Sequence, residues 1–102
     1  MEILFEVKTT SGKIIRTTRS HWELISKLKH PEIEGKEAEA KNCLSTPLEI
    51  RRSSEDPHVY LYYSPYMTYY LCVVARHLNG DGFIITAYIT DKIKEGEVVW
   101  KK

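Results

Sequence analysis

The sequence has few of the residues that usually mark exported or membrane proteins. Cysteine occurs only twice in 102 residues, at Cys43 and Cys72. Two thiols are too few for the disulfide framework of a small secreted domain, so we expect a reducing, cytoplasmic location. No apolar run approaches the roughly 20 residues that cross a bilayer, and no positively flanked apolar segment opens the chain. We therefore expect a soluble protein with no membrane span and no secretory signal.

The signature motifs of common enzyme classes are also missing. The chain contains no Walker loop, no paired CxxC, no HExxH and no Gly-x-Ser-x-Gly. His58 and His77 flank separate predicted strands and do not combine with either cysteine at zinc-ligand spacing. We therefore predict no metal site and no cofactor. Any catalysis would depend on His, Arg, Thr and Tyr side chains, which we expect between the first helix and the central strands.

Strong charge of one sign is absent as well. The formal net charge is +1, so polyanion binding would have to come from local clusters. Residues 1–30 carry six bases against three acids, whereas residues 31–60 carry seven acids against four bases. The basic surplus therefore lies toward the N-terminal end.

Local patterns predict a single α+β domain over residues 1–102, although the same residues could be one domain of a longer protein. Residues 2–8 alternate apolar and polar side chains, as a half-buried strand does, and a turn at 10–13 leads into a second strand. Ser20 with Glu23 forms a capping box for a helix that His30-Pro31 ends. The expected elements are strands at 2–8 and 14–18, helices at 21–30 and 34–44, strands at 48–52, 59–64, 68–77 and 82–90, one turn at 91–95 and a short strand ending at Trp100.

The four strands between residues 48 and 90 are separated by turn signals, which predicts an antiparallel meander. Residues 69–75 and 83–89 have apolar side chains at both odd and even positions. We therefore expect central strands that are covered on both faces, one of them by helices. The helix at 34–44 has few large apolar residues and is expected on the surface.

Two histidines are candidates for acid–base chemistry. His21 stands in the first turn of a helix beside Arg19, where free backbone N–H groups and a cation both favour an anion such as phosphate. The alternative is a solvated histidine with no function. His30 is a second candidate, and its alternative is an imidazole that interacts with the last carbonyls of the helix.

Three arginines could bind phosphate. Arg51 and Arg52 are adjacent in a strand, so they point to opposite faces and one of them can face a site. A guanidinium binds phosphate bidentately and keeps its charge through a reaction. Arg76 closes an apolar run, and it is either a second cation for substrate or a strand-end charge in solvent.

Hydroxyl groups are the last candidates. Thr86 and Tyr88 lie two residues apart on one face of an apolar strand, so they either bond each other or line the floor of a cleft. The tyrosines between residues 60 and 70 could stack on unpaired bases, but cross-strand packing in a hairpin is the favoured interpretation.

Four short segments follow one another along the chain: His21-Trp22, His30-Pro31-Glu32-Ile33, Leu44-Ser45-Thr46-Pro47 leading to Ile50, and Ile84-Ile85-Thr86-Ala87-Tyr88. In this order they resemble the phage- and toxin-associated nuclease domains of the barnase, EndoU, colicin and RelE type (BECR). The resemblance implies a BECR-like fold: an N-terminal hairpin, two short helices and a meander. It also implies metal-independent, toxin-like endoribonuclease activity that forms a 2′,3′-cyclic phosphate.

The resemblance also implies roles for individual residues. His21 would be general base or acid, with His30 as a second acid–base candidate. Arg51 would stabilise the phosphate, and Thr86 and Tyr88 would orient it. Arg19 and Arg76 would bind the RNA substrate. An antitoxin or immunity protein would be the partner.

A different class of function is also compatible with the sequence. The tyrosine-rich hairpin could serve a non-catalytic module that binds protein or RNA, since tyrosine is favoured at interfaces.

Overall fold

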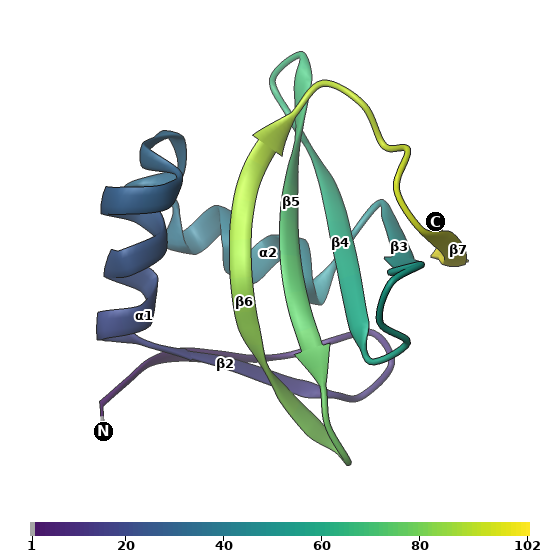
Figure 1. Cartoon of the computed structure of the whole chain (residues 1–102), viewed down its shortest axis with the longest axis horizontal. Helices are drawn as coiled ribbons and strands as arrows, with labels where there is room; N and C mark the ends of the chain where they lie inside the picture. The colour runs from purple at the N-terminus through teal and green to yellow at the C-terminus, as the bar shows by residue number, and fades with distance from the viewer. Residues whose placement is uncertain (1) are drawn as a thin grey trace.

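The computed structural model describes residues 2–102, and in it a mixed sheet is backed by short helices (Figure 1). The elements in chain order are β1 (Ile3–Lys8), β2 (Ile14–Thr18), α1 (Arg19–Glu23), the π-helical η1 (Leu24–Lys29), the 3₁₀ turn η2 (Pro31–Ile33), α2 (Glu37–Ser45), β3 (Glu49–Arg52), β4 (Val59–Tyr66), β5 (Tyr69–His77), β6 (Asp81–Thr90) and β7 (Glu97–Lys101). The predicted α+β class is confirmed.

The antiparallel meander is also confirmed, because β3, β4, β5 and β6 pair in succession. The full sheet has seven strands in the order β1-β2-β6-β5-β4-β3-β7. It is mixed, since β2 pairs in parallel with β6 through residues 14–16 and 81–83. In Figure 1 the β1–β2 hairpin accordingly crosses the lower end of the upright strands.

The first helix begins earlier than the capping pattern predicted. Thr18, not Ser20, is the N-cap: its backbone is extended and its hydroxyl accepts the N–H of His21 at 3.2 Å. A threonine at the end of a strand can take this role because the N-cap residue itself has extended backbone angles. From Leu24 the helix widens, and the N–H of His30 donates to the carbonyl of Ile25 at 2.7 Å, a π-type bond. His30-Pro31 ends the helix as predicted.

The second helix lies closer to the core than expected. It begins at Glu37, after η2, and buries Ala40, Cys43 and Leu44. The prediction of a surface helix was therefore wrong for the side of α2 that carries these three residues. The small side chains of Ala40 and Cys43 allow the helix backbone to approach the sheet. Figure 1 shows α2 behind the central strands.

Both faces of the central strands are covered, as predicted, but by different means. The helix side holds a core that includes Trp22, Ile25, Leu44, Val73 and Ile84. The opposite face carries a smaller cluster without helical residues, formed by Leu61, Tyr63, Cys72 and Val74, with Val59, Tyr70, Ile85, Tyr88 and Ile93 packed against it. We call this second side the open face.

The segment between β6 and β7 completes the open face. Residues 91–96 contain no helical turn, contrary to the expectation, and they carry Ile93 onto the small cluster. At Gly96 the φ angle is +81°, and a Cβ there would lie 2.4 Å from the carbonyl oxygen of Arg52. Glycine is therefore required for the segment to approach β3 this closely.

Candidate functional site

Three of the residues predicted as catalytic lie on the open face. Arg51 is opposite Leu61 in the sheet register, Thr86 is opposite Val74, and Tyr88 is opposite Cys72. Directly opposed residues share a face, and Leu61, Val74 and Cys72 all belong to the open-face cluster. The three side chains therefore point away from the helices, and the expected position between the first helix and the strands is wrong for them.

A β-bulge in β6 contributes to this arrangement. Val74 pairs with Thr86 but Ala75 pairs with Ile84, which leaves Ile85 without a partner of its own. A bulge turns consecutive side chains toward the same face, and here Ile85 joins the open-face cluster next to Thr86. Beyond Phe83 the outer edge of β6 is not paired with β2, and His21 and His30 of the helical segment contact β6 there instead.

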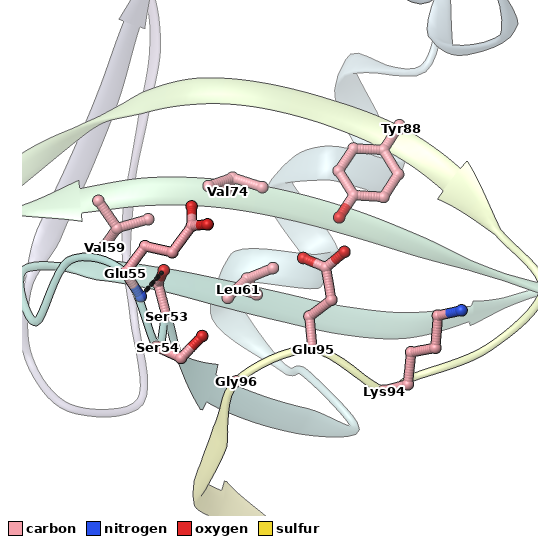
Figure 2. Close-up of a pocket in the computed structure, with 10 residues that line it drawn as sticks. All are labelled: Ser53, Ser54, Glu55, Val59, Leu61, Val74, Tyr88, Lys94, Glu95 and Gly96. Atoms are coloured by element: carbon pink, nitrogen blue, oxygen red, sulfur yellow. Dashed lines mark hydrogen bonds between the residues drawn. The ribbon is translucent and has the colours of Figure 1, made fainter.

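The open face contains a cleft of about 540 Å³ (Figure 2). Its floor is apolar and consists of Val59, Leu61 and Val74. The remaining walls come from the loop after β3, from Tyr88 and from the segment before β7, and their residues are Ser53, Ser54, Glu55, Lys94, Glu95 and Gly96. Figure 2 shows the Tyr88 hydroxyl directed toward the Glu95 carboxylate, with Glu55 at the other end. The cleft thus has an apolar base and acidic groups at both ends.

Tyr88 is held in its protonated form. Burial raises the pKa of the Tyr88 phenol well above its usual range, and Cys72, Tyr63 and Glu95 add to the shift. Burial likewise raises the pKa of Cys72 to about 12 and raises the pKa of Tyr63 above its usual range. Near neutral pH Tyr88 can therefore act as a hydrogen-bond donor but not as a base.

His30 lies beside Tyr88 at the edge of the sheet. The two rings have centroids 5.6 Å apart and are tilted by 39°. Nδ1 of His30 is 3.4 Å from a carboxylate oxygen of Glu32, which leaves Nε2 as the nitrogen that can exchange a proton with a ligand. The η1 helix and Pro31 fix the backbone at this position.

Arg51 is near the cleft but is already paired. Its Nε donates to Glu49 at 2.6 Å, and both side chains are largely buried. Nη1 is 3.5 Å from the carbonyl oxygen of Gly96. Arg51 therefore joins β3 to the segment before β7, and it borders a neighbouring hollow that also contains Lys92, Lys94 and Lys101.

Thr86 has a hydroxyl without a partner. Its Oγ1 is buried and makes no hydrogen bond with residues 2–102. The mutual bond with Tyr88, one of the two expected arrangements, is therefore not formed. An unsatisfied buried hydroxyl costs on the order of 1–3 kcal/mol, so Thr86 is a weak point in the stability of the strand.

The structure does not bring His21, Arg19 or Arg76 into the cleft. Nε2 of His21 donates to the carbonyl of Ile85 at 3.0 Å, and the ring borders a separate apolar hollow. Arg19 forms an exposed ion pair with Glu2 at 2.8 Å. Arg76 binds Asp56 at 2.8 Å at the other end of the sheet. These three remain candidates from sequence only.

Sequence reasoning missed Glu32, which lies beside His30, and Glu55 and Glu95, which line the cleft. Each lies outside a strand or a long helix, where no periodicity indicates which way a side chain points. The one usable signal is Gly96, since a glycine directly before a strand marks a close approach of the backbone.

Most of the hairpin tyrosines contribute to packing, the interpretation that the sequence favoured. Tyr62 and Tyr63 are fully buried, one on each side of the sheet. Only Tyr69 is half exposed, next to Met67 at the tip of the hairpin. A stacking platform made of all these rings is therefore not present.

Within residues 2–102 no three His, Cys, Asp or Glu side chains are grouped so that they could hold a metal ion. Cys43 and Cys72 are buried on opposite sides of the sheet as free thiols. Across the same part of the chain, none of the helices has the length and apolar character needed to span a membrane.

The chain matches no protein-family model, no curated protein and no solved structure. Its function is therefore inferred from the side chains around the cleft.

Proposed function

We propose that the protein is a metal-independent, toxin-like endoribonuclease with a BECR-like fold, whose active site is the cleft on the open face. One observation carries the proposal: a carboxylate (Glu95) and a phenol (Tyr88) line one end of this cleft, and an imidazole (His30) packs against the Tyr88 ring, although the three residues come from distant parts of the chain. These are the groups that acid–base cleavage of RNA needs when no metal takes part.

The reaction requires two proton transfers. A base takes the proton of the 2′-hydroxyl, the 2′-oxygen attacks the adjacent phosphorus, and the bond from phosphorus to the 5′-oxygen breaks. An acid then protonates the departing 5′-oxygen, which yields a 2′,3′-cyclic phosphate and a free 5′-hydroxyl. We assign the base to Glu95 and the acid to His30, whose Nδ1 lies 3.4 Å from a carboxylate oxygen of Glu32.

The negative charge that develops on the nonbridging phosphate oxygens needs hydrogen-bond donors. Tyr88 suits this role because its raised pKa keeps the hydroxyl protonated. Thr86 can add a second donor once its side chain rotates, since its hydroxyl has no bond to give up among the described residues. Arg51 acts less directly, because it is already bound to Glu49.

The neighbouring hollow favours a polyanion. Arg51, Lys92, Lys94 and Lys101 border it, against the acids Glu49 and Asp91. Flanking phosphates of an RNA strand can bind there while the scissile phosphate lies in the cleft. An acidic antitoxin or immunity protein could cover the same lysines. RNA cleavage also fits a cytoplasmic protein.

Incubation with several RNAs in EDTA tests the proposal. We expect cleavage and 2′,3′-cyclic phosphate ends, identified by mass spectrometry of the fragments. Glu95→Gln should reduce the rate by about 100-fold or more, the usual contribution of an acid or base. Glu39→Gln, on the exposed side of α2, is the matched control and should cleave normally.

Intact RNA with every substrate would contradict the proposal. A shift of RNA mobility without cleavage would favour the alternative, a non-catalytic binding module. The observation that supports a protein-binding version is the exposure of Met67 and Tyr69 at the hairpin tip. Met67→Ser with Tyr69→Ser should then abolish capture of a partner and leave the fold intact.

A further inference from the structure

A second hollow lies on the helix side of the sheet, where the turn of the β1–β2 hairpin meets β3 and β7. Its volume is about 280 Å³, and Tyr60, His77, Trp100, Ile50 and Lys13 line it. None of these residues borders the cleft of Figure 2. The hollow therefore combines three aromatic or imidazole rings with one cation, separately from the proposed active site.

Two of the rings are stacked and fixed. The rings of Tyr60 and His77 have centroids 4.0 Å apart and an interplanar angle of only 16°. Nε2 of His77 is 2.7 Å from the hydroxyl of Tyr62, which is fully buried. This bond restricts rotation of the imidazole. Such a flat surface exists before any ligand binds, so little conformational entropy is lost when a planar group stacks on it.

His77 contributes a neutral ring. Burial, with a smaller effect of Lys13, lowers the pKa of its imidazole to about 4. At neutral pH it therefore presents an aromatic surface without charge. Trp100 and Val99 are partly exposed and complete an apolar lining on the β7 side.

Cationic groups continue from this hollow around the end of the sheet. Lys13 also borders an adjoining hollow of about 450 Å³, together with His58 and Arg76. Nζ of Lys13 donates to the carbonyl of Leu78 at 3.0 Å, which holds the ammonium group at the boundary. Arg76 is paired with Asp56, so the unbalanced charge comes from Lys13 and from His58 when it is protonated.

We infer that this end of the sheet binds a nucleoside phosphate, with the base on the outer face of the Tyr60–His77 stack, beside Trp100, and the phosphate beside Lys13 and His58. Aromatic rings stack on any base because every base has a π face, whereas an ammonium group attracts the phosphate. The inference goes beyond the proposed ribonuclease and does not depend on it, since a mononucleotide contains no bond for that reaction to cleave.

Isothermal titration calorimetry with AMP, UMP, adenosine and inorganic phosphate tests the inference. We expect one saturable site for AMP and UMP, with adenosine binding about tenfold more weakly and phosphate more weakly still. Tyr60→Leu should weaken AMP binding by at least about tenfold, whereas Tyr60→Phe, which keeps the stacked ring, should bind AMP as tightly as the wild type. Lys13→Met should lower the affinity for AMP to that for adenosine. Lys29→Met on η1 is the matched control and should bind AMP as the wild type does.

Three results would overturn the inference. The first is the absence of saturable binding for every mononucleotide. The second is equal affinity for phosphate and AMP, since the base would then contribute nothing. The third is unchanged AMP binding in both Tyr60→Leu and Lys13→Met, once thermal unfolding has shown that the variants are folded.

Discussion

The imidazole of His30 and the phenol of Tyr88 lie against each other, with ring centroids 5.6 Å apart. One residue ends the first helical segment and the other belongs to β6, a central strand. Their contact joins the helix end to the cleft on the open face. It places His30, rather than His21, against the phenol that lines the cleft.

His30→Asn should therefore abolish most RNA cleavage. An amide keeps some hydrogen bonding but cannot donate a proton to the leaving oxygen, so we expect a loss of about 100-fold or more in kcat. KM should change little. Gel-based cleavage assays under saturating RNA measure both parameters. A variant with the kcat of the wild type would remove His30 from the mechanism.

His21→Ala separates a catalytic role from a structural one. The ring donates to the Ile85 carbonyl at 3.0 Å, so its loss should lower the free energy of unfolding by about 1 kcal/mol. Because His21 is outside the cleft, we expect cleavage by the folded variant to be within about threefold of the wild type, a margin well below an acid–base contribution. A rate loss of tenfold or more would restore the catalytic role predicted from the sequence.

Thr86→Val tests the unsatisfied hydroxyl. Valine has nearly the same shape, so the variant should be as stable as the wild type or more stable, by up to about 1–3 kcal/mol. Urea unfolding gives this difference. If Thr86 orients the phosphate, the same variant should also cleave RNA more slowly. A clear loss of stability would mean that the hydroxyl has a partner in solution.

His77 should make the protein sensitive to mild acid. Its pKa is about 4 in the folded protein against an ordinary value of 6.5, so only the unfolded chain takes up the proton between these values. Stability should therefore fall as the pH drops from about 6.5 to 4, by at most about 1.4 kcal/mol per pH unit.

The matched variant is His77→Phe, which keeps a ring against Tyr60. It should flatten the pH dependence in this window. Asp56 has a lowered pKa, held down mainly by the His58 N–H and by Arg76, and its contribution to stability is lost only below its ordinary value of 3.8. Unfolding midpoints across the pH range in both proteins give the comparison. Equal slopes would contradict the assignment to His77.

Gly96→Ala should damage the cleft through the backbone. The left-handed φ angle and the carbonyl of Arg52, 2.4 Å from the position of a Cβ, both oppose a side chain. We expect a loss of more than about 1 kcal/mol in unfolding free energy, together with slower RNA cleavage because Glu95 is displaced. Gly12→Ala has a similar φ angle but open space around it, so it should retain activity.

The sequence by itself determined the local elements. Alternating residues predicted the β1–β2 hairpin, turn residues predicted the meander, and His30-Pro31 predicted where the first helix ends. These features depend on neighbours in the chain, whose side-chain period and backbone preferences are visible in the sequence. The shared face of Thr86 and Tyr88 followed from the same two-residue period.

Only the tertiary structure determined on which side of the sheet Thr86 and Tyr88 lie and which other residues meet them there. The parallel pairing of β2 with β6, the bulge at Ile85 and the close approach at Gly96 depend on contacts between distant residues, which leave no periodic signal. These contacts bring Glu95 to the side of the cleft toward which the Tyr88 hydroxyl points, pack His30 against the Tyr88 ring, and leave His21 outside the cleft. The sequence therefore predicted local elements and a set of candidate side chains, whereas the non-local pairing of strands determined which side chains meet.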